Sequence, residues 1–209
     1  MVIITGVSRG IGKYLFQDFT NSGEIVYGIY NKTSPDLDKQ KYLIKVDISN
    51  RSDVKNWIHK IKEKIENIIL INCAGINYNA FAHKAKIDKW SEVINVNLIG
   101  TFNVISEILP IMRDQGYGRI INFSSVVAQT MVPGTSAYSA SKAGLWGLTR
   151  SIAIENASKG ITINNLNLGY FDIGMIKDVP PDYAKVLKEK LPNKSFGNPK
   201  DIIKLTGFS

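Results

Sequence analysis

Short apolar segments alternate with segments of helical periodicity along the whole 209-residue chain. The apolar segments are rich in Val, Ile and Leu, and few polar residues interrupt them. Such strands, each followed by a helix, are typical of a parallel sheet covered on both faces. The pattern predicts strands at 2–5, 25–30, 42–47, 68–72, 119–124 and 161–166, and helices at about 10–22, 51–66, 88–115 and 137–158. We therefore expect one three-layer, doubly wound α/β domain spanning residues 1–209.

The helix expected at 137–158 is apolar on more than one side. Leu145, Trp146, Leu148, Ile152 and Ile154 spread around much of its circumference. A sheet covers only one side of a helix, so a second surface is needed for the other. The pattern predicts a homodimer or homotetramer built on this helix and on the one that spans 90–115.

Composition excludes several classes of protein. Hydrophobic residues make up 44% of the chain and charged residues 21%, as is ordinary for a soluble globular domain. No apolar run approaches the roughly 20 residues of a membrane helix, and Met1 leads directly into the first strand without a signal peptide. One cysteine, Cys73, forms no internal disulfide, and with two histidines it makes a poor metal set. We expect a cytoplasmic protein without a metal.

The net charge of +8 raises the question of a nucleic-acid partner. Most of the excess comes from lysines that are scattered along the chain, without an aromatic-plus-basic recognition motif. This distribution favours a solvated surface and no nucleic-acid binding. An acidic substrate or an acidic carrier protein stays compatible with it.

The stretch "TGVSRGIG" at 5–12 follows the first strand and opens the first helix. Glycines at such a junction permit a tight turn, close approach of the backbone to a pyrophosphate, and close packing of helix on strand. The first N–H groups of the helix then face the phosphates. On its own the motif is equally compatible with a tight structural turn.

Other motifs accompany it in a fixed order. "VDIS" ends the third strand at 46–49, "NCAG" ends the fourth at 72–75, "NVNL" lies at 95–98, and "SSVV" follows at 124–127, before Tyr138-Ser-Ala-Ser-Lys142. With these residues the chain resembles the short-chain dehydrogenase/reductase family from residue 1 to about 205. The resemblance implies a Rossmann fold and a nicotinamide cofactor, with "SRGIG" and "SSVV" closest to 3-oxoacyl-[acyl-carrier-protein] reductases of fatty acid biosynthesis.

Tyr138 and Lys142 are four residues apart and share one face of a helix. A phenol titrates near pH 10, and a neighbouring ammonium lowers its pKa. We expect Tyr138 to be the general acid of carbonyl reduction and Lys142 to tune it. Ser125, thirteen residues before Tyr138, is expected to hydrogen-bond the substrate oxygen, with Ser124 as its rival. The resemblance adds Asn97, which would hold a water for proton resupply, and a bond from Lys142 to the nicotinamide ribose.

The candidate cofactor-binding residues are Gly6, Ser8, Arg9, Gly10, Ile11, Gly12, Asn31, Lys32, Asp47, Ile48, Asn72, Ala74, Gly75, Tyr138, Lys142 and Gly169. Asp47 matches the family's adenine-contacting position. Cys73 replaces an asparagine of the family's NNAG, and its small side chain fits a packed strand end without being a nucleophile. After the sixth strand, Leu168 replaces the family's proline and Ile173 stands near a threonine that bonds the nicotinamide. From the resemblance we expect that loss of the threonine hydroxyl weakens the anchoring of the nicotinamide without abolishing hydride transfer.

The residues that follow the second strand predict the cofactor. NAD-dependent enzymes place a carboxylate at the end of this strand to bond the ribose 2′-hydroxyl. Tyr30 stands there instead, followed by Asn31 and Lys32, while Arg9 stands inside the glycine motif. A guanidinium pairs with phosphate through charge-assisted bonds. The pattern therefore predicts NADP(H).

Three functions remain open. The first is carbonyl reduction of a 3-oxoacyl thioester on acyl carrier protein. Such reductases carry basic docking residues at two positions, and this chain has Lys159 at one of them but Gly116 at the other. The second is reduction of a sugar or another small ketone, since the segment at about 170–198 that shapes the pocket follows no recognisable pattern. The third is a non-catalytic nucleotide sensor. The family also continues past "FGNPKDIIKLTGFS" with a seventh strand, so we expect either a shortened chain or a sixth strand at the sheet edge.

Overall fold

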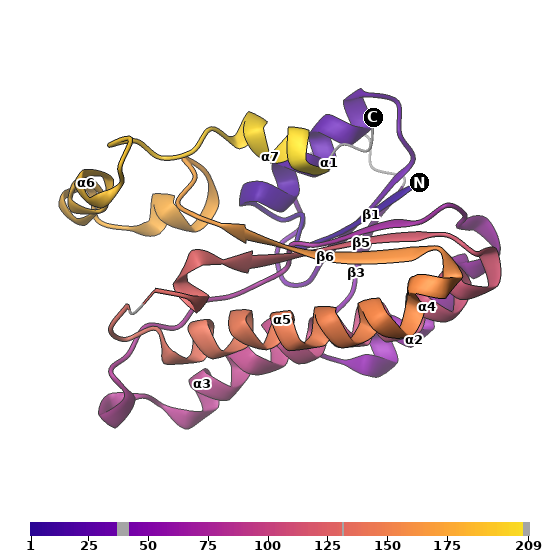
Figure 1. The fold of residues 1–209 in the computed structure, drawn as a ribbon, viewed down its shortest axis with the longest axis horizontal. Coiled ribbons are helices and arrows are strands. Elements are labelled where there is room, and N and C mark those ends of the chain that lie inside the picture. Colours follow the sequence, from indigo (N-terminus) through magenta and orange to yellow (C-terminus); the bar gives the residue numbers. More distant parts are fainter. Residues whose placement is uncertain (37–41, 131, 207–209) are drawn as a thin grey trace.

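The sheet has six parallel strands in the order β3-β2-β1-β4-β5-β6 (Figure 1). In this computed structural model, residues 1–36, 42–130 and 132–206 are described. The strands are β1 (Val2–Thr5), β2 (Val26–Tyr30), β3 (Leu43–Lys45), β4 (Ile69–Asn72), β5 (Gly118–Ser125) and β6 (Ile161–Leu168). The expected doubly wound fold is confirmed. The third strand is shorter than predicted, because Val46 and Asp47 leave the ladder at its end, and β6 continues to Leu168.

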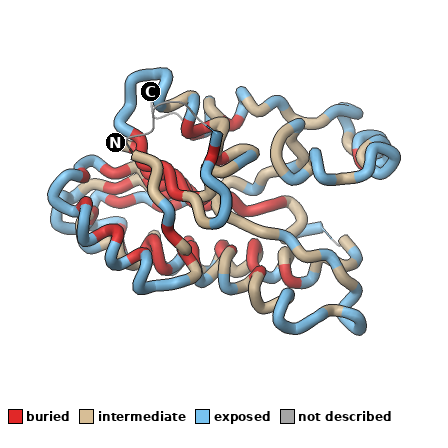
Figure 2. Tube along the Cα trace, turned by 180° about the vertical axis from the view of Figure 1, so that it is seen from behind, coloured by how far each residue is buried: buried red, intermediate tan, exposed pale blue. Residues whose placement is uncertain are grey.

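Helices cover both faces of this sheet (Figure 1). One face carries α1 (Gly10–Asn21) and α7 (Pro199–Thr206), and the other carries α2 (Arg51–Ile61), α4 (Thr101–Gln115) and α5 (Ser136–Asn156). Buried side chains form one apolar cluster on each face, and the buried parts of the chain lie in the strands and on the inward sides of the helices (Figure 2). The strand β1 is buried along its whole length, which explains its unbroken Val-Ile-Ile run.

One long helical stretch holds a local irregularity. The helix α3 (Ile87–Ile94) continues through a π-helix (Asn95–Gly100) directly into α4. The whole stretch Ile87–Gln115 is long and apolar enough to cross a membrane by length and composition alone, contrary to the expectation from the sequence. Its inward residues Val104, Ile105, Ile108 and Met112 are fully buried in the sheet-facing core, as in a core helix of a soluble protein.

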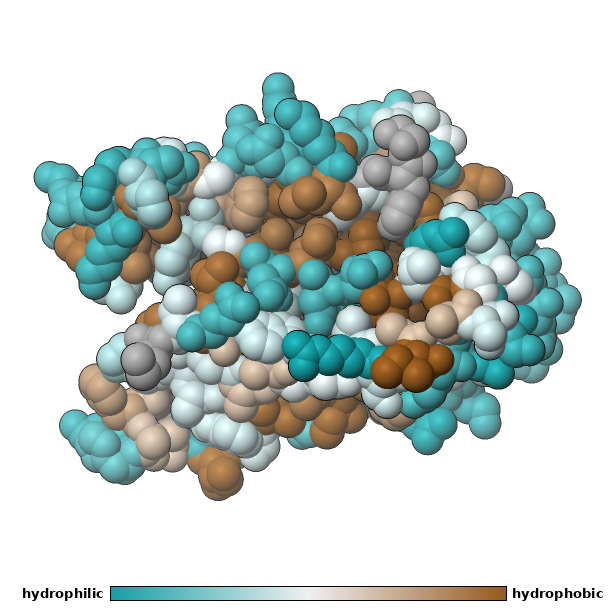
Figure 3. Space-filling view, viewed as in Figure 1, coloured by the Kyte–Doolittle hydropathy of each residue, from teal (hydrophilic) through white to brown (hydrophobic). Residues whose placement is uncertain are grey.

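The region after β6 contains helical structure that the sequence pattern did not predict. A 3₁₀-helix spans Gly174–Asp178, and α6 (Pro181–Lys190) lies beyond the carboxyl end of β6 (Figure 1). The sequence does contain signals for both ends of α6. Pro181 opens the helix and Asp182 lies in its first turn, while Lys188 lies in its last turn. Among the described residues no strand pairs with the outer side of β6, so this strand forms one sheet edge. Figure 3 views the molecule from the β6 side, and apolar side chains are visible between the upper and lower helices.

Candidate active site

A cleft of about 910 Å³ lies at the carboxyl ends of the strands. The strand order reverses between β1 and β4, and in open α/β sheets ligands bind beside such a switch point. Its lining brings together the glycine-rich turn, the ends of β2 to β5, the start of α5 and the segment after β6. The volume is at the upper end of the range for small-molecule and cofactor sites, about 300–1,000 Å³.

The glycine-rich turn leaves no room for side chains at its three glycines, and Gly6 and Gly12 are the most crowded. A Cβ on Gly6 would lie 2.6 Å from Cα of Ala74, and one on Gly12 would lie 2.3 Å from the carbonyl oxygen of Gly6. Gly6 and Gly10 also have φ of +76° and +61°, which favours glycine. Gly12 does not line the cleft and serves the close packing of α1 on the turn.

The amino end of α1 fits a phosphate group. The helix begins at Gly10, and the side chain of its N-cap residue Arg9 makes no capping hydrogen bond. The free N–H groups of the first turn, together with the helix dipole, favour an anion. Ser8 and Ile11 line the cleft beside this turn, and the Ser8 hydroxyl donates to the carbonyl oxygen of Thr33 at 2.7 Å. The backbone here therefore fits the pyrophosphate of a dinucleotide.

The adenosine end of the cleft is formed by the ends of β2 and β3. Asn31, Lys32, Asp47 and Ile48 all line it. One oxygen of Asp47 accepts hydrogen bonds from the backbone N–H of Ser49 at 3.0 Å and from its hydroxyl at 2.6 Å. Partial burial is the largest single influence and raises the pKa of Asp47, but these bonds, a hydrogen bond with Asn31 and the charge of Lys32 together outweigh it, and the pKa is lowered. The carboxylate thus stays charged and fixes the turn that follows β3.

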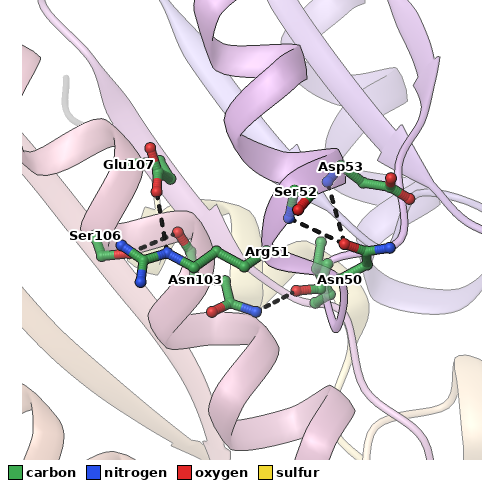
Figure 4. Close-up of polar contacts among 8 residues, drawn as sticks. Asn50, Arg51, Ser52, Asp53, Asn103, Ser106 and Glu107 are labelled. Atoms are coloured by element: carbon green, nitrogen blue, oxygen red, sulfur yellow. Dashed lines mark hydrogen bonds and ion pairs between the residues drawn. The ribbon is translucent and has the colours of Figure 1, made fainter.

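This turn is tied to α2 and α4 (Figure 4). The Asn103 side chain in α4 donates to the carbonyl oxygen of Ile48 at 2.9 Å. Asn50 caps α2 by accepting from the N–H groups of Ser52 and Asp53, and Arg51 contacts Glu107 of α4 at 3.3 Å. The residues expected to contact adenine therefore stand on a turn that is held from two sides.

At the other end of the cleft, Ser125 ends β5 and Tyr138 lies in the first turn of α5. Burial raises the pKa of Tyr138, and a side-chain hydrogen bond with Ser125 lowers it by less. The expectation that Lys142 lowers this pKa is not met, because the Lys142 ammonium lies 5.7 Å from the centre of the Tyr138 ring and donates to the carbonyl oxygen of Phe123 at 2.7 Å. The phenol therefore stays protonated at neutral pH.

Lys142 is only 5% exposed. Removal from water disfavours its charged form and lowers its pKa to about 8. Its neighbour Cys73 is partly buried, and removal from water raises the pKa of that thiol to about 12. The thiol is therefore protonated at neutral pH, in keeping with a packing role at the end of β4.

The two serines that end β5 differ in their hydrogen bonds. The Ser124 hydroxyl donates to the carbonyl oxygen of Lys142 at 2.9 Å and accepts from the Trp146 indole at 2.9 Å. It is thereby engaged in holding α5 against the sheet. Ser125 is the serine that bonds Tyr138, and its oxygen accepts from the N–H of Val127 at 3.2 Å. This geometry favours Ser125 over Ser124 as the residue facing a substrate.

Asn97 lies in the π-helix and is fully buried without lining the cleft. Its amide exchanges two hydrogen bonds with the backbone of Ile76, at 2.8 and 2.9 Å, and donates to the Ser141 hydroxyl at 3.0 Å. A Cβ on Gly75 would lie 3.3 Å from the Asn97 side-chain oxygen and 3.5 Å from Nζ of Lys142. Asn97 and Lys142 thus lie on either side of Gly75. Asn97 belongs to a π-helical turn, and such turns are frequent at functional sites.

Asn72 lies away from the cleft, unlike Ala74, Gly75 and Gly169, which line it. Its amide donates to Asn122 at 2.8 Å, and Asn122 in turn donates to Thr149 of α5 at 3.0 Å. Thr149 then donates to Asn165 at 2.9 Å. The three asparagines are in register across β4, β5 and β6, so Asn72 belongs to a buried ladder that positions α5.

The end of β6 and the segment after it line the cleft with several residues that the sequence analysis did not single out. Leu168 and Ile173, noted as departures from the family, both line the cleft. So do Met175, Ile176, Val179, Tyr183 and Leu187. The apolar spacing of Val179, Tyr183 and Leu187, four residues apart, is the signal that could have placed α6 beside the cleft. Within the described ranges, no three His, Cys, Asp or Glu side chains group as a metal site would require.

Comparison with known proteins gives a consistent picture. The sequence profile described as "short chain dehydrogenase" matches residues 1–184. The chain is 35% identical over 218 residues to an acetoacetyl-CoA reductase of Rhizobium meliloti, covering 100% of this chain and 89% of the relative. It is 34% identical over 216 residues to a 3-oxoacyl-[acyl-carrier-protein] reductase of Thermotoga maritima, covering 99% and 88%. The ligand-free structure of Thermoplasma acidophilum aldohexose dehydrogenase superposes with a TM-score of 0.88 at 27% identity, over 99% and 85% of the two chains.

Proposed function

The chain belongs to the short-chain dehydrogenase/reductase family, whose oxidoreductases act on CH–OH and C=O groups, and we propose that it reduces a 3-oxoacyl thioester with NADPH. The observation that carries the proposal is the convergence of Ser125, Tyr138 and Lys142 at one end of a dinucleotide-sized cleft. The relatives named as acetoacetyl-CoA and 3-oxoacyl-carrier reductases support the substrate class.

The chain's own residues supply the proton of the reaction. A substrate carbonyl oxygen placed between the hydroxyls of Ser125 and Tyr138 accepts a hydrogen bond from each. Charge that develops on this oxygen is stabilised by the Ser125 donor, and Oη of Tyr138 gives up its proton to it. The nicotinamide cofactor, when bound, supplies the hydride for the carbonyl carbon. The raised pKa of Tyr138 keeps the phenol in its proton-donating form before the reaction.

Lys142 and Asn97 are placed to restore that proton. The Lys142 ammonium is the nearest buried cation to the Tyr138 ring, and Asn97 faces it across Gly75. The Asn97 amide is held rigidly by Ile76 and Ser141. We assign Lys142 the role of returning a proton to the phenolate left after transfer and Asn97 that of the residue beyond it on the path to solvent.

The adenosine end supports NADP(H). At the end of β2, Tyr30 lines the cleft in place of a carboxylate, and among the residues that the structure describes Arg9 and Lys32 are the cations at this end. A carboxylate at this position would repel a 2′-phosphate, whereas a guanidinium pairs with it through charge-assisted bonds.

The substrate side of the cleft supports an acyl group. Its walls carry mostly apolar side chains, among them Val126, Val127, Ile176, Val179 and Leu187. An apolar wall gains free energy by covering an alkyl chain, at about 25 cal/mol per Å² of surface removed from water. It offers less to a sugar, whose hydroxyl groups need partners.

A sugar substrate is the second candidate. It is favoured by the similarity to the aldohexose dehydrogenase structure and by the Asn77 and Asn79 side chains at the cleft. The deciding experiment follows NADPH consumption with acetoacetyl-CoA, acetoacetyl-carrier protein and a panel of keto sugars, and NADP⁺ reduction with aldohexoses. We expect turnover with the two thioesters. Turnover confined to the sugars would overturn the proposed substrate, and none at all would favour a nucleotide sensor.

We further propose that two or four copies assemble through α4 and α5. Apolar side chains stand exposed there, including Phe102 and Ile154, the latter 84% exposed. Light scattering at micromolar concentration tests this, with Ile154→Asp as the variant expected to give monomers. A monomer mass for the wild type would contradict it. Docking of an acidic carrier is proposed for the exposed end of α5 near Lys159, in keeping with the net charge of +8.

A further inference from the structure

The segment after β6 sits directly on the glycine-rich turn. A Cβ on Gly10 would lie 2.9 Å from Cα of Gly174, so the two backbones are nearly in contact. Both glycines have positive φ, +61° and +73°. Four residues further on, Asp178 contacts the residue before Gly10: its Oδ2 lies 3.0 Å from an Nη of Arg9. The segment Gly174–Asp178, which we call the latch segment, is thus attached to the turn at two points.

The Arg9–Asp178 pair connects two parts of the chain with different roles. Arg9 stands in the turn that fits a pyrophosphate, whereas the latch segment also lines the substrate side of the cleft through Met175 and Ile176. The side chains of Arg9 and Asp178 are 70% and 60% exposed. A pair this exposed is weak and can be exchanged for another partner.

The second cation of the adenosine end also faces a carboxylate. Nζ of Lys32 lies 3.9 Å from Glu92, which is shared with Lys89 at 3.1 Å. Each cation expected to contact a 2′-phosphate is therefore opposed by a carboxylate of the chain itself. Of the two contacts, only that of Arg9 is at hydrogen-bond distance.

We propose that Asp178 is a cofactor-selectivity residue that competes with the 2′-phosphate of NADP(H) for Arg9. In the free protein Asp178 holds Arg9 and keeps the latch segment on the glycine-rich turn. A 2′-phosphate, with its greater negative charge, takes over the guanidinium and repels the carboxylate, which releases the latch segment. NAD(H) lacks this phosphate and leaves the contact in place. The proposal rests on the NADP(H) preference proposed above.

The test measures nucleotide binding without turnover. Affinities for adenosine 2′,5′-bisphosphate and for 5′-AMP are compared by calorimetry in the wild type, Asp178→Asn and Asp172→Asn. Asp172 lies in the same region but pairs with Lys177, at 2.6 Å, so it is the matched control. We expect Asp178→Asn to bind the bisphosphate about fivefold more tightly, because an exposed ion pair no longer has to be exchanged. Its affinity for 5′-AMP, and both affinities of Asp172→Asn, should stay within about twofold of the wild type.

Each outcome decides one of the two proposals. Equal affinities of the wild type for the two nucleotides would overturn the NADP(H) preference, whatever the variant does. An Asp178→Asn affinity for the bisphosphate that is unchanged or weaker would overturn competition at Arg9, and a weaker one would show instead that Asp178 orients the guanidinium.

Hydrogen exchange supplies a second readout. In the wild type, the amides of residues 174–179 should exchange faster when the bisphosphate binds. Their exchange rate should not change when 5′-AMP binds. In Asp178→Asn they should exchange faster without any nucleotide. Slower exchange of the wild-type segment with the bisphosphate would mean that the nucleotide closes the latch segment, against the proposal.

Discussion

The two ends of the cleft hold their charged groups in opposite ways. At the catalytic end the Lys142 ammonium is 5% exposed and bonds a backbone carbonyl, and Asn97 is fully buried with three hydrogen bonds. At the adenosine end, Arg9 and Lys32 are 70% and 83% exposed and face carboxylates across the surface. The catalytic end is rigid and poorly solvated. At the adenosine end the cations are exposed and can exchange one ion-pair partner for another.

This difference matches the two tasks of the cleft, proton transfer at the catalytic end and cofactor selection at the adenosine end. A buried polar group that loses its partner costs far more than an exposed ion pair, which contributes about 0–1 kcal/mol. Groups that move a proton benefit from the rigid environment, since their geometry and pKa are then fixed before the substrate arrives. Groups that select a cofactor can exchange partners. Mutations at the catalytic end should therefore change rates by orders of magnitude, and those at the adenosine end by smaller, salt-sensitive factors.

Removal of the Tyr138 hydroxyl should have the largest effect. We expect Tyr138→Phe to lower kcat by about 10²–10⁴-fold, the usual contribution of a general acid, with the fold and nucleotide binding retained. Steady-state reduction of acetoacetyl-CoA, together with circular dichroism, measures both. Tyr117→Phe, before β5 at the opposite end of the sheet, is the control and should keep its activity. A Tyr138→Phe variant with more than half the wild-type rate would mean that another residue is the acid.

The pH dependence of reduction tests the buried lysine. Burial lowers the pKa of Lys142 to about 8 and raises that of Tyr138, so the phenol stays protonated while the ammonium is lost above about pH 8. Reduction uses the protonated forms, and kcat/KM should therefore fall about tenfold per pH unit above this value. A profile from pH 6 to 10 checks it, with Lys142→Met as a low, flat reference. A wild-type profile that stays level to pH 10 would show that the charge of Lys142 is not needed.

The same contrast explains what the sequence predicts. The six strands and the helices α1, α2, α4 and α5 follow from apolar periodicity, because burial imposes it. Ser125, Tyr138, Lys142 and Asn97 follow from family motifs, and the structure brings the first three together at one end of the cleft. The motif of Asn72, by contrast, suggested a cofactor contact, whereas its side chain bonds Asn122 inside the sheet.

Other features depend on contacts between segments far apart in the chain. The Arg9–Asp178 pair joins residues 169 positions apart, and no local pattern encodes it. The raised pKa of Tyr138 also escaped prediction, because the spacing of Tyr138 and Lys142 does not reveal that the ammonium bonds Phe123 instead. The helix α6 is a different case, since its proline and its apolar spacing were present in the sequence.

At the adenosine end, Arg9→Ala should shift cofactor choice by a moderate factor. Charge-assisted bonds contribute about 1.5–3 kcal/mol, and exposure and exchange with Asp178 place Arg9 at the low end of this range. We expect the ratio of kcat/KM for NADPH over NADH to fall about tenfold, with little change for NADH. Lys13→Ala on α1, which does not line the cleft, is the control. An unchanged ratio in Arg9→Ala would remove Arg9 from this role.

A change in salt concentration should have the smallest effect. It compares the adenosine and catalytic ends of the cleft within a single protein. The Debye length falls from about 10 Å at 0.1 M to about 3 Å at 1 M, so contacts of exposed cations weaken over this range whereas buried ones change little. We expect the NADPH preference to shrink by about threefold between these concentrations. The rate ratio of wild type to Tyr138→Phe, measured at saturating NADPH, should stay constant, because Tyr138 and Lys142 are shielded from mobile ions. A ratio that changes as much as the cofactor preference does would mean that salt reaches the catalytic end, and that the two ends do not differ in solvation as their burial indicates.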